Sequence, residues 1–190
     1  MNDAPELLAV VDAVVSALTQ TGTPYFVTGS LASSVHGEFR ATNDLDIVAK
    51  LSAAQLPSLL DKLSAGFVAD IDQATNALAE QSGFNLIHRV TYLKVDIFPC
   101  SSSFDNEAMR RAEAIAIPGS SESVRVATKE DILLAKLRWY QLGSEESEMQ
   151  RRDIQRLVTL NRADFDDAYL SHWAEQLQVT ALLQRFSASR

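Results

Sequence analysis

The sequence predicts an α/β (α+β) fold, a mixed sheet flanked by helices and followed by a helical C-terminal part. Short apolar stretches rich in β-branched and aromatic residues, at 25–28, 44–48 and 92–98, indicate strands, and amphipathic stretches lie between them. From residue 127 onward only helical periodicity is found. We therefore expect a core at residues 1–126 and a C-terminal helical part at 127–190 that packs on it.

Several elements are predicted from local pattern. Helices are expected at 4–18, at 52–63 with Ser52 as the cap, at 72–81 and at 104–111. Further extended stretches are expected at 67–69, 85–90, 112–117 and 123–126. In the C-terminal part, a capping-box-like start at 128–131 begins a helix that stops at Gly143. Another helix is expected at 145–160, and one or two closing helices follow.

Composition excludes some classes of protein. The formal net charge of −8 argues against broad electrostatic binding of nucleic acid. The sequence contains no run of about 18 apolar residues, so it predicts no membrane-spanning helix. The acidic start lacks the basic region of a signal peptide, and Cys100, the single cysteine, excludes an internal disulfide. We therefore expect a cytoplasmic protein with no membrane contact.

Three acidic residues stand inside apolar strands. Asp44 and Asp46 are separated by one residue, so on a strand they project to one face while Leu45 points to the other. Asp96 lies in a second apolar strand. If the two strands pair, the three carboxylates share one part of a sheet, where their repulsion is best explained by a bound cation. Oxygen ligands suit magnesium, and we expect two divalent ions.

A glycine and a serine precede these acids. Gly29 permits close approach of the backbone to a phosphate, and Ser30 offers a hydroxyl at the start of a short helix. Arg40 lies in the loop before Asp44. It has two open interpretations, a contact with a phosphate or an aspartate, and a surface salt bridge.

The combination of Thr28-Gly29-Ser30, Asp44-Leu45-Asp46 and Val95-Asp96-Ile97 resembles the nucleotidyltransferase superfamily related to DNA polymerase β. The resemblance covers about residues 24–99. It implies magnesium-dependent transfer of a nucleoside monophosphate from an NTP to an acceptor hydroxyl on tRNA, protein or a small molecule. The implied catalytic and metal-binding residues are Asp44, Asp46 and Asp96, and Gly29 and Ser30 would bind the triphosphate.

A second resemblance, over about residues 127–160, is to AbiEii-type toxin nucleotidyltransferases. It rests on Lys129-Glu130-Asp131 at a helix start, on Lys136 and on Arg152-Asp153, and it implies that Lys136 and Asp153 join the nucleotide site. The alternatives are that Lys136 reaches water or that the two side chains pair with each other. A role in a toxin–antitoxin system, with a toxin or antitoxin as partner, follows from this resemblance.

Lys94 also has competing interpretations. It falls on the same strand face as Asp96, where it would neutralise that acid or meet a phosphate. A solvent-directed side chain is the favoured expectation. For the whole protein, the rival to an enzyme is a nucleotide-binding antitoxin or regulatory module of the same fold that does not turn over.

Overall fold

The computed structural model describes residues 4–37, 44–116 and 123–188. The chain divides into two compact units. The first comprises the described residues of 1–31 and 41–127, and the second those of 32–40 and 128–190. Helix α2 (Gly29–Val35) begins in the first unit and continues into the second.

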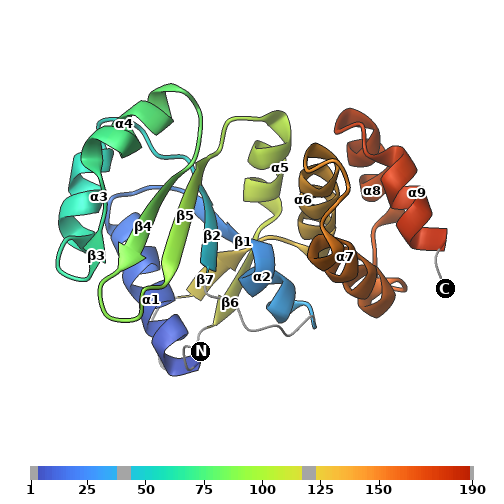
Figure 1. Cartoon of the computed structure of the whole chain (residues 1–190), viewed down its shortest axis with the longest axis horizontal. Helices are drawn as coiled ribbons and strands as arrows, with labels where there is room; N and C mark the ends of the chain where they lie inside the picture. Colours follow the sequence, from blue (N-terminus) through green and yellow to red (C-terminus); the bar gives the residue numbers. More distant parts are fainter. Residues whose placement is uncertain (1–3, 38–43, 117–122, 189–190) are drawn as a thin grey trace. The chain divides into compact units, whose positions relative to one another are not determined.

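The first unit contains a seven-stranded mixed sheet in the order β3-β4-β5-β2-β1-β7-β6 (Figure 1). Strand β2 pairs with β5 in parallel, and β1 pairs with β7 in parallel, whereas the other neighbours are antiparallel. The predicted mixed sheet is therefore confirmed. The strands are β1 (Tyr25–Thr28), β2 (Asp44–Ala49), β3 (Phe67–Val68), β4 (Phe84–His88), β5 (Lys94–Pro99), β6 (Glu113–Ala116) and β7 (Ser123–Val126).

Alternation along β2 and β5 gives this part of the sheet one apolar face. Leu45, Ile47, Val95 and Ile97 are each at most 1% exposed. Residues that alternate with them in a strand must point to the opposite side. The acids of both strands therefore project from the other face of the sheet.

Among the described residues, four helices lie wholly in the first unit: α1 (Ala4–Gln20), α3 (Leu56–Leu63), α4 (Ile71–Ala79) and α5 (Ser103–Arg111). Helix α1 buries an apolar stripe of Val10, Val11, Val14, Val15 and Leu18. Helix α5 begins with a capping box, in which the Asp105 amide donates to Ser102 Oγ and the Ser102 amide donates to Asp105 Oδ2.

Several predicted boundaries in this unit are wrong, and two of these errors have a clear local cause. The helix expected at 52–63 begins at Leu56, because Ser52 does not cap it and instead donates from its hydroxyl to Gln55 Oε1 at 2.7 Å. The strand expected from residue 92 begins at Lys94, because Tyr92 has a φ of 57°. A residue in this left-handed region belongs to the turn and not to the strand.

The second unit contains α6 (Lys129–Leu142), α7 (Glu148–Asn161), α8 (Asp167–Gln176) and α9 (Thr180–Ala188). The helix expected from residue 145 begins at Glu148, because Ser144 and Glu145 have positive φ and Ser147 is the N-cap. Among the described residues, we find no helix with the length and apolarity needed to cross a membrane.

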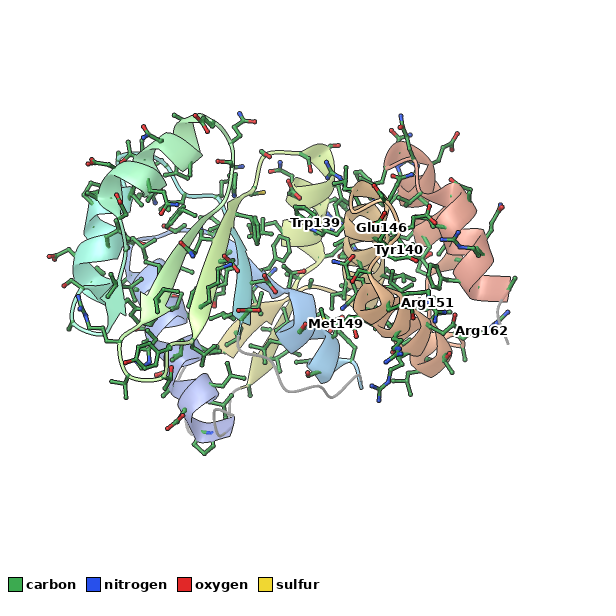
Figure 2. The ribbon with its side chains drawn as sticks, in the orientation of Figure 1. Trp139, Tyr140, Glu146, Met149, Arg151 and Arg162 are labelled. Atoms are coloured by element: carbon green, nitrogen blue, oxygen red, sulfur yellow. The ribbon has the colours of Figure 1, made fainter. Side chains whose placement is uncertain are left out.

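The core of the second unit joins α6 to the closing helices. The Tyr140 ring on α6 packs edge-on to that of Phe186 on α9, with centroids 5.9 Å apart. Asp131, at the start of α6, accepts hydrogen bonds from Thr128 Oγ1 and from the Tyr169 hydroxyl of α8. Figure 2 labels Tyr140 and its chain neighbour Trp139, which is by contrast 56% exposed.

Candidate active site

The three predicted acids come together on one face of the first unit's sheet. In the parallel pairing of β2 with β5, Asp46 lies opposite Asp96 and Asp44 lies opposite Lys94. Residues opposite each other in adjacent strands project to the same face, and adjacent strands are about 4.8 Å apart. The expected pairing of the two strands is therefore confirmed, and it gathers Asp44, Asp46 and Asp96.

Two further polar residues extend this arrangement, and sequence reasoning gave neither of them a role in the site. Thr28 of β1 lies opposite Asp46, and Asn85 of β4 lies opposite Asp96. The four residues form one transverse row across β1, β2, β5 and β4, and all are of intermediate exposure. A polar residue between the buried Phe84 and Leu86 was the available sequence signal for Asn85, but only the register places it beside Asp96.

Gly29 lies directly against the Asp46 carboxylate. Its φ is +68°, in the left-handed region that favours glycine, and a Cβ built there would lie 1.9 Å from Asp46 Oδ2. The absent side chain thus leaves the space that this carboxylate occupies. Ser30 follows in α2 and is half-buried. Arg40 lies outside the described residues.

Lys94 contributes a positive charge to the acidic face. Its Nζ lies 2.8 Å from Asp96 Oδ1, and the side chains of Lys94 and Asp96 are 42% and 18% exposed. The hydrogen bond to Asp96 raises the pKa of Lys94, and the charges of Asp96, Asp44 and Asp46 add to this, while desolvation acts in the opposite direction. The ion pair corrects the favoured expectation that Lys94 is merely directed to solvent.

Lys136 and Asp153 form an ion pair within the second unit. Lys136 Nζ on α6 lies 3.1 Å from Asp153 Oδ2 on α7, and the side chains are only 13% and 11% exposed. The alternative in which these two residues pair with each other is therefore confirmed. The contact links the two helices, and the low dielectric around a largely buried pair strengthens the attraction between the two charges.

The residues that the structure describes include no group of three or more His, Cys, Asp or Glu side chains arranged as a metal-ion site. The chemistry of the acidic face nevertheless fits a hard cation, since its carboxylates are the ligands that Mg2+ prefers. The Lys94 ammonium at Asp96 is an observed cation of the chain itself at this face.

No protein-family model matches the chain, and no curated protein matches it in sequence. Solved structures do match. An antigenic nucleotidyltransferase-like protein from Paracoccidioides brasiliensis is 16% identical, with a TM-score of 0.59 over 98% of this chain and 94% of that one. The antibiotic-resistance factor ANT(2'')-Ia is 13% identical, with a TM-score of 0.56 over 98% and 96%.

A third similar structure is the lincosamide antibiotic adenylyltransferase LnuA with lincomycin bound, which is 18% identical. Its TM-score is 0.51, over 83% of this chain and 98% of that one. At such identities the likeness concerns the course of the backbone. These matches, together with the mixed sheet described above, show that the chain has the nucleotidyltransferase fold.

Proposed function

We propose that this protein is a magnesium-dependent nucleotidyltransferase that moves a nucleoside monophosphate from an NTP to an acceptor hydroxyl. The observation that carries the proposal is the register that sets Asp46 opposite Asp96, with Asp44 on the same face. Three carboxylates gathered on one face repel one another, which is a cost that a cation-binding function explains. The nucleotidyltransferase fold supports the same conclusion.

In the proposed site, Asp44, Asp46 and Asp96 would hold two Mg2+ ions. When bound, the ions would neutralise phosphate charge and lower the pKa of the acceptor hydroxyl. Gly29 and Ser30 would lie along the triphosphate, and Ser30 would hold a phosphate oxygen without donating a proton to the reaction. The acceptor oxygen forms a bond to the α-phosphorus, the bond to the leaving pyrophosphate breaks, and the acceptor proton passes to solvent.

Arg40, Lys136 and Asp153 are the remaining residues that the proposal assigns to the nucleotide site. Arg40 is a candidate for a phosphate contact because it precedes Asp44 in sequence. Lys136 and Asp153 are proposed to act together, since they form one ion pair in the second unit. Positioning of the reactants and neutralisation of charge would supply most of the rate enhancement.

For the acceptor we favour a small hydroxyl compound over tRNA or protein. ANT(2'')-Ia has been solved with adenylyl-2''-tobramycin, and LnuA with lincomycin, so two proteins of similar backbone accept small molecules. The net charge of −8 also disfavours a long polyanion.

A cytoplasmic toxin–antitoxin role, with a toxin or antitoxin partner, rests only on the AbiEii-type resemblance of residues 127–160.

The test of the enzyme is incubation with each labelled NTP and magnesium in cell extract, followed by identification of the labelled product. Asp96→Asn should leave MgATP binding, measured by calorimetry, nearly intact and remove transfer. We expect this because Asp44 and Asp46 lie on the same face of β2 and would coordinate both ions. Asp96 from β5 would complete the coordination of the acceptor-side ion only. MgATP binding without any labelled acceptor would favour the rival, a regulatory module without turnover.

A further inference from the structure

The acidic face holds a cation that the chain itself supplies, the Lys94 ammonium. Lys94 Nζ lies 2.8 Å from Asp96 Oδ1, and Lys94 lies opposite Asp44 in the register of β2 and β5. On the other side of β5, Lys94 lies opposite Ile87, which offers no charge. Lys94 thus lies between Asp44 on β2 and Ile87 on β4, and its ammonium contacts Asp96 of its own strand.

The same Asp96 oxygen would be needed by a divalent ion. A carboxylate that is held by an ammonium at hydrogen-bond distance is a poorer ligand for a second cation, because the two positive charges repel and compete for the same lone pairs. Lys94 is 42% exposed in its side chain, so the ammonium can leave Asp96 by rotating toward water without unpacking the core. Exchange of one cation for another is therefore sterically open.

We infer that Lys94 is a built-in counter-cation that a divalent ion must displace from Asp96 when it binds, an inference that rests on the proposed metal-dependent function. Before metal binds, Lys94 offsets part of the repulsion among Asp44, Asp46 and Asp96. The displacement lowers affinity for the metal alone. A nucleotide that brings negative phosphates restores the charge balance, so loading of the ion together with the nucleotide is favoured over loading of the ion alone.

The experiment measures binding of Mn2+ alone, without nucleotide, to the full chain by paramagnetic resonance of the free ion. Lys94→Gln removes the competing charge and should tighten Mn2+ binding by about fivefold or more, equivalent to about 1 kcal/mol. Lys94→Arg keeps the charge and should bind Mn2+ with close to wild-type affinity. Melting temperatures with and without Mn2+ give a second readout, and Mn2+ should stabilise Lys94→Gln more than wild type.

A matched control separates local competition from a change in net charge. Lys62→Gln removes one positive charge from the same unit, at an exposed site where Lys62 Nζ donates to Gln20 Oε1. It should leave Mn2+ affinity unchanged. Lys94→Met provides a second neutral variant should Lys94→Gln fold poorly.

The outcomes distinguish this inference from the proposed function. Equal Mn2+ affinity in wild type, Lys94→Gln and Lys94→Met overturns the inference and leaves the metal site standing. A gain in Lys62→Gln as large as in Lys94→Gln also overturns it, because the effect would then be one of net charge. If no variant binds Mn2+, with or without ATP, the metal site and the inference both fall.

Discussion

The Asp46 carboxylate occupies the space where a side chain at Gly29 would stand. The distance from a Cβ built on Gly29 to Asp46 Oδ2 would be 1.9 Å, well inside any real contact. The two residues come from neighbouring elements, β2 and the start of α2. The Gly-Ser and Asp-x-Asp motifs are therefore one steric unit, in which the glycine permits the position of the acid.

Gly29→Ala should abolish transfer, because the added methyl group must push the Asp46 carboxylate away from its position. Gly22→Ala is the matched control, since Gly22 has a similar φ of +63° but nothing within 4 Å of its built Cβ. Both variants should lose about 1 kcal/mol of stability from the left-handed backbone. Transfer assays and urea unfolding of both proteins check this, and equal activity losses would show that backbone strain alone is responsible.

Asp46→Asn should reduce transfer by several orders of magnitude while the melting temperature stays the same or rises. The substitution keeps the size of the side chain and removes one of three like charges from the acidic face. Asp61→Asn, an exposed position on α3, serves as the control and should keep full activity. A fall in melting temperature that parallels the loss of activity would instead make Asp46 a structural residue.

Lys136→Met should destabilise the second unit by about 1–3 kcal/mol, because it leaves the largely buried Asp153 carboxylate without its partner. The double variant Lys136→Met with Asp153→Leu should be more stable than either single variant, since no charge is then left buried alone. Urea unfolding of the four proteins gives the coupling between the two residues.

The control for that cycle is an exposed pair within α7, the helix that carries Asp153. The Nη2 atom of Arg151, a residue labelled in Figure 2, lies 3.0 Å from Glu148 Oε2, and both side chains are about half exposed or more. Arg151→Gln should leave stability nearly unchanged because exposed pairs contribute little. Similar losses for Arg151→Gln and Lys136→Met would contradict the role of burial.

The rate of alkylation of Cys100 should rise with pH, and the midpoint of this rise should lie above that of the same cysteine in the urea-unfolded chain. Desolvation of the half-buried thiol, aided by the Asp105 carboxylate, raises the pKa of Cys100, while the charge of Lys50 acts to lower it. Because the Cys100 thiol then keeps its proton to a higher pH in the folded state, its contribution to the free energy of unfolding should fall as pH rises past the unfolded-state pKa. Rates with iodoacetamide measured from pH 7 to pH 10 decide this, and a midpoint at or below the unfolded value would refute it.

The sequence by itself determined most elements and the residue types of the site. The bounds of β1 and β7 follow from local pattern, because strand alternation depends on neighbours within a few residues. The same alternation places Asp44 and Asp46 on one face. Local turns were harder, as at Tyr92 and Ser144, because positive φ at these residues is imposed by the surrounding chain and not by their own preference.

Only the tertiary structure decided which distant residues meet. The parallel pairing of β2 with β5 sets Asp46 opposite Asp96, and a shift of one residue would have turned Asp96 to the other face. That register also brings Lys94 to the acids and Asn85 beside Asp96, and the packing of α6 on α7 pairs Lys136 with Asp153. Pairing and packing sum many weak contacts between segments far apart in sequence, and no local pattern encodes that sum.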